Sequence, residues 1–216
     1  MVAARFLVAA LGLASAVAAA PAAAQSINYA PNGQSLYYWG PSSSRNQFYG
    51  EGFTAPNSNL ADFSLTVATA FQGDSFDFVA QVYAFTEIGY TYTLLGPALY
   101  TSAVQTISST SFTTFTFDPN VALTQGDQYI ALVTNDPNGT SLGGSGFGIM
   151  EQGSGGPGQF YYGFYNNPFF NACCHVDAAF EADFNSGSPS VPEPSSLALL
   201  AAGLVGLAGL RMRRRA

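Results

Sequence analysis

Between Gln25 and Ser190, apolar and polar residues alternate with a period of two, and no stretch places its apolar residues every 3.6 positions. Such alternation indicates strands with one buried face. It is clearest in three segments, whose expected inward-facing residues are Ala61, Phe63, Leu65 and Val67, then Phe76, Phe78, Ala80, Val82 and Ala84, and finally Val176, Ala178, Phe180, Ala182 and Phe184. The Phe- and Thr-rich segment 111–117 predicts another strand, and the near-continuous apolar run 129–134 predicts a central strand buried on both faces.

Turn-forming sequences separate these segments: Gly73-Asp74, Gly96-Pro97, Asp118-Pro119-Asn120, Gln125-Gly126-Asp127 and Asp136-Pro137-Asn138-Gly139. Many short strands divided by such turns predict one all-β domain over residues 25–184, a β-sandwich of jelly-roll-like kind. The Gly- and Ser-rich stretch 143–159 is expected to form a long exposed loop. Residues 185–190 are polar and rich in Gly, Ser and Pro, which predicts a linker.

The charges of this central body are one-sided. The chain has no lysine, and only Arg45 of its six arginines lies in the body, against twelve acidic residues there, so the body has a net charge of −11 with His175 neutral. A surface this acidic repels phosphate backbones, which excludes nucleic acid as a partner. It also argues against docking on anionic lipid. Because the acids are scattered, they indicate a soluble surface that repels itself.

The N-terminal 24 residues have the three parts of an export signal. Arg5 supplies a positive charge, residues 6–20 are apolar apart from Gly12 and Ser15, and Ala22-Ala23-Ala24 gives the small residues of a cleavage site. We expect signal peptidase to cleave between Ala24 and Gln25. Cleavage after Ala20 and an uncleaved anchor helix are the alternatives.

The C-terminal tail, residues 191–216, also has three parts. It opens with the motif Val191, Pro192, Glu193, Pro194 and Ser195, in which two prolines hold the chain extended. The uncharged segment 197–210 then predicts a helix of about 21 Å at 1.5 Å per residue, shorter than the ~30 Å hydrocarbon core that it would cross. The chain ends with a cluster of long basic side chains that reach the membrane interface: Arg211, Arg213, Arg214 and Arg215. By the positive-inside rule these arginines stay cytoplasmic and the body lies outside.

This order of motif, short apolar helix and arginine cluster resembles the PEP-CTERM sorting signal of Gram-negative bacteria. The resemblance implies that an exosortase, a membrane-embedded enzyme, recognises residues 191–195 and cleaves near Pro-Glu-Pro. The inner membrane would hold the chain at least transiently, with the body in the periplasm, before the body reaches the cell surface or the exopolysaccharide matrix. An ordinary C-terminal anchor with a proline linker is the alternative. Three body segments, 113–117, 123–129 and 176–180, are similar to extracellular sandwiches of such proteins, which implies a fold rather than an activity.

The two cysteines, Cys173 and Cys174, are adjacent. In an exported protein they are candidates for a vicinal or an intermolecular disulfide, and a reduced structural pair is the alternative. A metal or redox cluster with His175 and Asp177 is a further reading, although these residues are too close in sequence to converge easily. His175 is the only histidine, so a Ser–His or Cys–His hydrolase would have to use it, and no Gly-x-Ser-x-Gly sequence accompanies it.

Acidic residues offer two further kinds of site. Asp74, Asp77 and the segment 136–139 could supply oxygen ligands to calcium, but EF-hand spacing is absent and turn formation explains the same residues. A glycosidase acid pair would need two of Glu87, Glu151 and Glu181 to face each other. We therefore expect no catalytic residue, no metal ligand set and no cofactor.

Two aromatic clusters, in segments 37–49 and 161–170, are flanked by Asn and Gln. Aromatic faces beside amide groups are how sugar sites are built, and the candidates here are Tyr38, Trp39, Tyr161, Tyr162 and Tyr165. Packing in the core and along sheet edges is the alternative. The expected function is that of a non-enzymatic surface or matrix protein whose body binds polysaccharide, with a secreted hydrolase or a ligand-free structural or adhesion module as alternatives.

Overall fold

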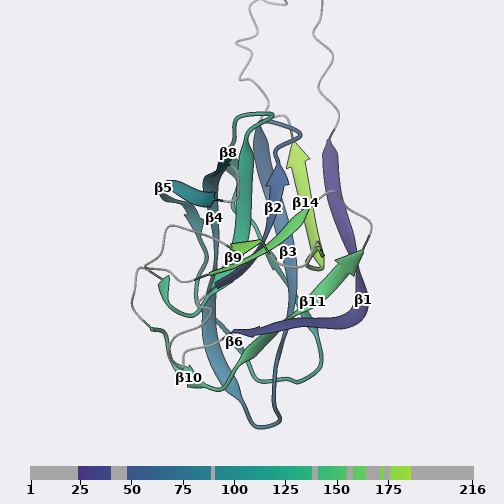
Figure 1. The fold of residues 1–216 in the computed structure, drawn as a ribbon, viewed down its shortest axis with the longest axis vertical. Helices are drawn as coiled ribbons and strands as arrows, with labels where there is room; N and C mark the ends of the chain where they lie inside the picture. Colours follow the sequence, from purple (N-terminus) through teal and green to yellow (C-terminus); the bar gives the residue numbers. More distant parts are fainter. Residues whose placement is uncertain are drawn as a thin grey trace, which may run out of the picture. The chain divides into compact units, whose positions relative to one another are not determined.

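The computed structural model describes residues 24–39, 48–88, 91–137, 141–154, 158–163, 171–172 and 176–185. All of them belong to one compact unit. These residues form strands almost throughout and contain no helix (Figure 1). The predicted all-β class is therefore confirmed for the described part of the chain. The signal segment up to residue 23, the end of the linker and the whole sorting tail lie outside the described residues.

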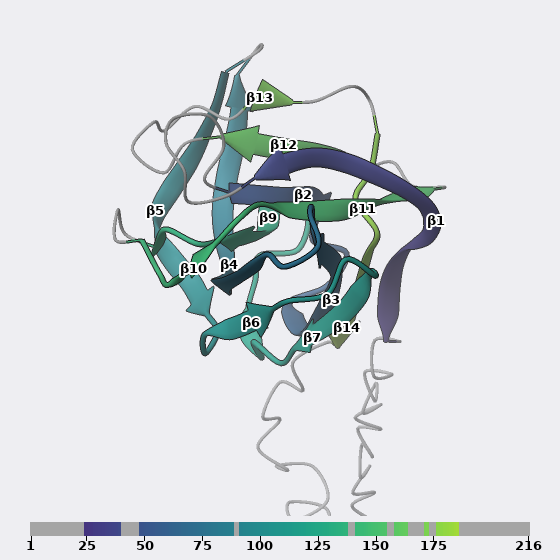
Figure 2. The same cartoon turned by 90° about the horizontal axis from the view of Figure 1, so that it is seen from below.

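Two antiparallel sheets pack against each other (Figures 1 and 2). The first contains β1 (Gln25–Trp39), β3 (Asn59–Thr69), β7 (Thr113–Phe117), β8 (Val121–Ala122), β11 (Gly148–Ser154) and β14 (Phe180–Asn185). The second contains β2 (Phe48–Thr54), β4 (Ser75–Ile88), β5 (Thr91–Thr101), β6 (Gln105–Ile107), β9 (Gln128–Thr134), β10 (Gly144–Ser145), β12 (Gln159–Gly163) and β13 (Asn171–Ala172). Each strand reverses direction relative to its neighbour, as short connections in antiparallel sheets allow.

Strands β14 and β11 share the space between β1 and β3, one after the other. The first half of β1 pairs with β14, and its second half pairs with β11. The strand β3 lies on the opposite side of β14 and β11 from β1. Its residues 59–65 pair with β14, and its residues 67–69 pair with β11. The strand β1 therefore forms one edge of the first sheet and bends sharply along its length (Figure 2).

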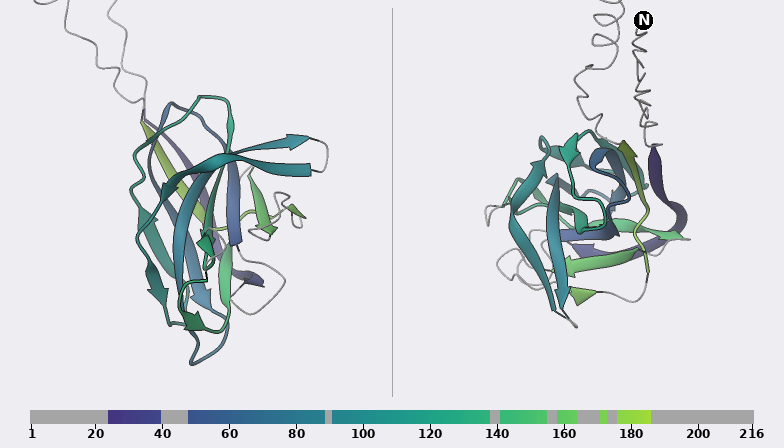
Figure 3. Two further views of the ribbon diagram at one scale, coloured as in Figure 1. Left: turned by 90° about the vertical axis from the view of Figure 1, so that its left-hand side faces the viewer. Right: turned by 90° about the horizontal axis from the view of Figure 1, so that it is seen from above.

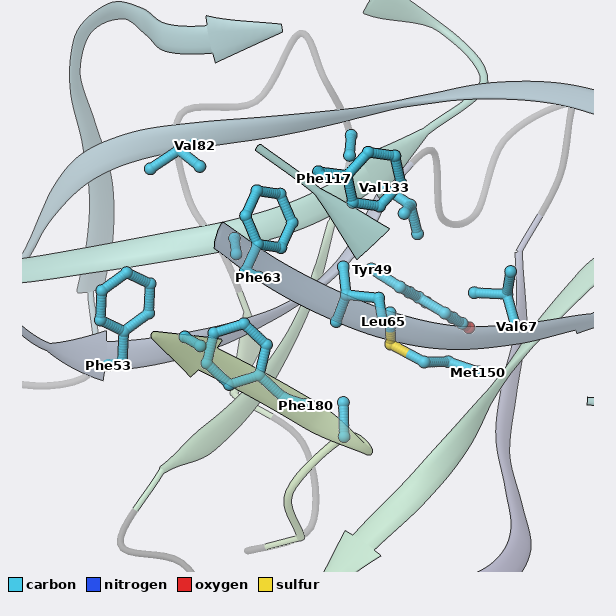
Figure 4. Close-up of a cluster of buried hydrophobic side chains, with 14 of the residues drawn as sticks. Tyr49, Phe53, Phe63, Leu65, Val67, Val82, Phe117, Val133, Met150 and Phe180 are labelled. Carbon is cyan, nitrogen blue, oxygen red and sulfur yellow. The ribbon is translucent and has the colours of Figure 1, made fainter. Parts of the chain in front are cut away.

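The core between the sheets is built from the alternating residues that the sequence predicts. Inward-facing side chains from both sheets form one cluster, which includes Phe63 and Leu65 of β3, Phe78 and Val82 of β4, Val133 of β9, and Phe180 and Phe184 of β14. Figure 4 shows Phe53, Phe63 and Phe180 gathered between the two layers. Full burial of such a side chain stabilises the fold by about 1.5–3 kcal/mol, so this cluster is the main source of stability. The period-two interpretation is thus confirmed for β4 and β14.

The predicted phase of the first segment is wrong at Ala61. Leu60 is fully buried at 0% exposure, whereas Ala61 is only half-buried. The pairing of β3 with β14 shifts here, because Asp183 pairs with Asp62 while the next residue, Phe184, pairs with Leu60. Ala61 is the extra residue of a β-bulge, and one extra residue moves every preceding side chain to the opposite face.

The predicted turn at Gly96-Pro97 is also wrong as a strand boundary, because both residues lie inside β5. Gly96 adopts a φ of 76°, and the pairing of β4 with β5 jumps from Val82–Tyr100 to Ala84–Leu95. Residues 96–99 are therefore a bulge within a continuous strand. The other described turn signals do separate strands, with positive φ at Gly73, Asn120 and Gly126; Asn138 and Gly139 lie outside the described residues.

The stretch 143–159 is not the long exposed loop that its composition predicts. It contains β10, β11 and the start of β12, and Met150 is fully buried. Its glycines serve close approach rather than exposure. A Cβ on Gly153 would lie 2.4 Å from the carbonyl oxygen of Ala178, so only glycine fits where β11 meets the chain leading into β14.

The outer face of the second sheet is also covered, by the strand β5. Tyr92 of β5 packs with six buried residues of β2, β4, β9 and β12: Phe48, Tyr83, Phe85, Ile130, Leu132 and Tyr161. Figure 3 shows the paired ends of β4 and β5 projecting beyond the rest of their sheet. This second layer buries residues 129–134 of β9 on both faces, which confirms the prediction of a central strand.

Candidate functional site

The two ends of the described chain lie next to each other on the first sheet. Gln25, the first residue of β1, pairs with Phe184, the last buried apolar residue of β14. Ala24 is exposed and precedes the strand, so the expected cleavage point stands at the border of the folded body. The strand β14 continues to Asn185, one residue into the predicted linker. Figure 1 shows the start of β1 and the end of β14 at the same end of the body.

A small amide network fixes this end of β14. Asn59 donates through Nδ2 to Oδ1 of Asn185 at 2.7 Å and to Oδ1 of Asn120 at 3.1 Å. These bonds join β14 to β3 and to the turn before β8. The point where the chain leaves for the sorting tail is therefore held by hydrogen bonds as well as by the burial of Phe184.

Most residues expected to carry chemistry lie outside the described part of the chain. This holds for the motif 191–195, the arginines at 211 and 213–215, Tyr165, Cys173, Cys174 and His175. For these residues the expectations from sequence stay predictions. Within the described residues, no three His, Cys, Asp or Glu side chains gather in a metal-binding arrangement. No helix in this part of the chain is long and apolar enough to cross a membrane.

The structure does not bring Tyr161 and Tyr162 onto one surface. They are neighbours on β12 and so point to opposite faces of the sheet. Tyr161 is 3% exposed and packs edge-on against Phe85 and Tyr92, with ring centroids 5.3 and 5.0 Å away. Burial raises the pKa of its hydroxyl, and Glu87 and Tyr92 add to the rise. Tyr162 packs against the main core. Tyr161 is therefore a packed core residue, as the alternative to sugar binding predicts.

Tyr38 and Trp39 lie elsewhere, at the end of β1 in the first sheet, where they pair with Ile149 and Gly148 of β11. The four sugar-binding candidates that the structure describes thus belong to strands of two different sheets. The sheet to which each strand belongs is decided by pairing between distant segments, which the spacing of these residues in the sequence does not report.

The three glutamates considered for a glycosidase pair each have a separate partner. Each accepts a hydrogen bond within a different pair of elements: Glu87 from the hydroxyl of Tyr92 at 3.0 Å, Glu151 from the N–H of Gly33 at 2.9 Å, and Glu181 from Nδ2 of Asn28 at 3.4 Å. Two of the three aspartates considered for calcium, Asp74 and Asp77, accept bonds as well. Asp74 accepts from the N–H of Phe147, and Asp77 accepts from the hydroxyl of Thr106. These acids brace loops and neighbouring strands.

Sequence reasoning missed Glu51, the most deeply buried acid that the structure describes. It lies on β2 at 0% exposure and points between the sheets with Tyr49 and Phe53. The signal was a charged residue in phase with two aromatic residues, in the sequence Tyr-Gly-Glu-Gly-Phe. The chain has no lysine, and all its arginines lie outside the described residues. Within the described part of the chain, only hydrogen bonds can offset the cost of burying the Glu51 carboxyl.

Glu51 joins the two sheets at the place where β14 begins. Its Oε2 accepts a hydrogen bond from the buried N–H of Ala178 at 2.8 Å. Burial raises the pKa of Glu51 well above its usual range, and Asp177 adds to the rise, while the backbone N–H groups of Ala178 and Gln159 offset part of it. Burial, followed by Glu51 and Asp177, raises the pKa of the neighbouring Tyr29 to about 12. This acid therefore serves as a structural acceptor for the strand that carries the sorting tail.

The comparisons with known proteins concern the tail. Residues 190–215 match the family model of the PEP-CTERM protein-sorting motif. The match confirms the resemblance seen in the motif, the apolar segment and the arginine cluster. No curated protein and no solved structure matches the chain.

Proposed function

We propose that this chain is an exported protein whose body is released to the cell surface or extracellular matrix after an exosortase acts on residues 191–195. The observation that carries the proposal is the match of residues 190–215 to the PEP-CTERM protein-sorting motif. Such a motif supports exosortase-dependent, membrane-associated sorting of an exported protein in Gram-negative bacteria. The finer steps below extend that statement to this chain.

Signal peptidase removes residues 1–24, and segment 197–210 then holds the chain in the inner membrane with its arginines on the cytoplasmic side. The body folds in the periplasm. Ala24 is exposed and Gln25 is the first strand residue, which supports a cleavage that leaves β1 complete. Cleavage near Pro192-Glu193-Pro194 separates the body from its anchor. Residues 186–190 separate the end of β14 from this motif in the sequence.

The body acts without catalysing a reaction. This part of the proposal is supported by the separate hydrogen-bond partners of Glu87 and Glu181 and by the structural position of Glu51. Polysaccharide binding stays a prediction that falls on Tyr38, Trp39, Tyr162 and Tyr165. A secreted hydrolase and a ligand-free structural or adhesion module are the competing functions.

The sorting proposal is tested by intact mass and cell fractionation of the protein from its native host. The mature species should begin at Gln25, end near Pro-Glu-Pro and lie at the surface or in the matrix. Changing Pro192, Glu193 and Pro194 together to alanine should keep the body in the inner membrane. Changing Ser186, Gly187 and Ser188 to alanine is the matched control and should leave sorting intact. A complete tail in both wild type and variant would mean a plain membrane anchor.

The role of the body is tested on the mature species with a glycan array. Loss of one aromatic contact in the Trp39→Ala variant should weaken binding about tenfold, which corresponds to about 1.4 kcal/mol. Tyr161→Phe, a change inside the packed layer, should leave binding unchanged. Self-association in the absence of any glycan would favour the adhesion module instead.

A further inference from the structure

Three residues of β1 leave the regular pairing with β11. Pro31 pairs with Gly153 and Ser35 pairs with Glu151, so Asn32, Gly33 and Gln34 stand opposite a single residue. All three are exposed to solvent. Gly33 adopts a φ of 79°, a conformation that glycine reaches without steric cost. This bulge presents an Asn-Gly sequence in a fixed geometry at the edge of the sheet.

Each reactive group of Asn32-Gly33 has a specific partner. The N–H of Gly33 donates to Oε1 of Glu151 at 2.9 Å. The N–H of Gln34 donates to Oδ1 of Asn32 at 2.9 Å, and Nδ2 of Asn32 donates to the carbonyl oxygen of Gly153 at 3.4 Å. Glu151 is only 7% exposed, so the surrounding chain holds its carboxylate in place.

We propose that Asn32-Gly33 is a self-modifying site, at which Glu151 promotes conversion of Asn32 to aspartate or isoaspartate. The backbone nitrogen of Gly33 attacks Cγ of Asn32 while Glu151 takes the proton of that N–H. The bond from Cγ to Nδ2 breaks, and the amide leaves as ammonia with the proton returned by Glu151. Water then opens the resulting five-membered succinimide at either carbonyl, which gives aspartate or isoaspartate.

Two of these three hydrogen bonds match the needs of this reaction. A carboxylate on the attacking N–H acts as general base. The Gln34 N–H stabilises the negative charge that develops on Oδ1 in the tetrahedral intermediate. Glycine at the following position leaves the attacking nitrogen without a neighbouring side chain, and nothing lies within 4 Å of where a Cβ of Gly33 would be. The product adds a negative charge beside Glu151 at the edge strand.

The chain supplies its own control, because Pro137-Asn138-Gly139 repeats the sequence Pro31-Asn32-Gly33. The mature protein is incubated at pH 7.4 and 37 °C, and each peptide is followed by mass spectrometry for the increase of about 1 Da and for isoaspartate. We expect Asn32 to react faster in the folded protein than in the same protein unfolded in urea. Glu151→Gln keeps an oxygen acceptor for the Gly33 N–H but removes the base, and it should slow Asn32 about tenfold or more without changing the rate at Asn138.

Two results would overturn the proposal. The first is a slower reaction of Asn32 in the folded than in the unfolded protein, which would mean that the three hydrogen bonds protect the amide. The second is an equal change at Asn32 and Asn138 in the Glu151→Gln variant. The first comparison uses the wild-type chain alone and therefore does not depend on folding of the variant.

Discussion

At the scale of single residues, the buried carboxyl of Glu51 depends on a glycine that faces it. A Cβ on Gly158 would lie 2.2 Å from Oε1 of Glu51 and 2.4 Å from the ring of Tyr29. Glycine at this position lets the carboxyl cross from β2 to the N–H of Ala178. Hydrogen bonding of ordinary geometry reaches only Oε2 of this carboxyl, from the Ala178 N–H, and leaves Oε1 buried without such a partner among the described residues, so burial favours the protonated acid. Glu51 and Gly158 therefore act together, although 107 positions separate them.

Removal of this acceptor should destabilise the protein more than replacement of the acid by its amide. Glu51→Ala leaves the Ala178 N–H buried without a partner, which costs about 1–3 kcal/mol. Glu51→Gln keeps an oxygen acceptor and should cost less. Urea unfolding of both variants at pH 5 measures the difference in free energy of unfolding. Equal losses in the two variants would show that the hydrogen bond to Ala178 contributes little.

At the scale of strands, the pairing of β3 with β14 opposes two acids. Asp62 pairs directly with Asp183 on the outward face, and Asp118 and Glu181 are near enough to act on Asp62. Partial burial, followed by the charges of Asp183, Asp118 and Glu181, raises the pKa of Asp62. Further along the same face the pairing of β3 with β7 is favourable, since Ser64 and Thr66 hydrogen-bond to Thr116 and Thr114. The first sheet thus contains one repulsive pair between strands that otherwise fit.

Neutralising one of these acids should stabilise the protein at neutral pH. Like charges directly opposite each other on paired strands cost about 0.2–1 kcal/mol, so Asp62→Asn should gain that amount at pH 7. The gain should vanish at pH 3, where Asp62 is protonated in both folded and unfolded chains. Asp127→Asn makes the same change of charge in the exposed turn before β9 and should gain less. If both variants gain the same free energy of unfolding at pH 7, the effect comes from the lower net charge and not from the pairing of Asp62 with Asp183.

At the scale of the whole molecule, the body carries a net charge of −11. The structure adds that burial raises the pKa of three acids among the described residues: Glu51, Asp62 and Asp136. A raised pKa in the folded state means that the acid stabilises the fold when protonated. That contribution is fully present below the unfolded pKa and is lost as the pH rises through the folded pKa.

The body should therefore be more stable at pH 5 than at pH 8. Each kcal/mol gained corresponds to a rise of about 2–4 °C in Tm for a chain of this size. Added salt should raise Tm at pH 8 more than at pH 5, because it screens repulsion between carboxylates. Thermal unfolding of the mature protein across this pH range checks both effects. A Tm that falls steadily from pH 8 to pH 5 would show that favourable interactions of ionised acids dominate instead.

The sequence alone determined what depends on neighbouring residues along the chain. The sorting tail is a contiguous pattern of prolines, apolar residues and arginines, and its match over residues 190–215 confirms it. The all-β class and the inward faces of β4 and β14 follow from local alternation, because side chains of a strand point alternately to its two faces. The burial of β9 on both faces follows from its near-continuous apolar run. These features need no knowledge of which segments pair.

The tertiary structure decided what depends on contacts between distant segments. Glu51 meets Ala178 across 127 positions of sequence, and Gly33 meets Glu151 across 118. The bulge at Ala61, the continuous strand through Gly96 and the buried strand β11 all arise from pairing partners that local composition does not specify. Tyr161 is a core residue because side chains of β2, β4, β5 and β9 gather around it on that face of its sheet. Alternation fixes the phase of a strand, but burial is decided by what packs against each face.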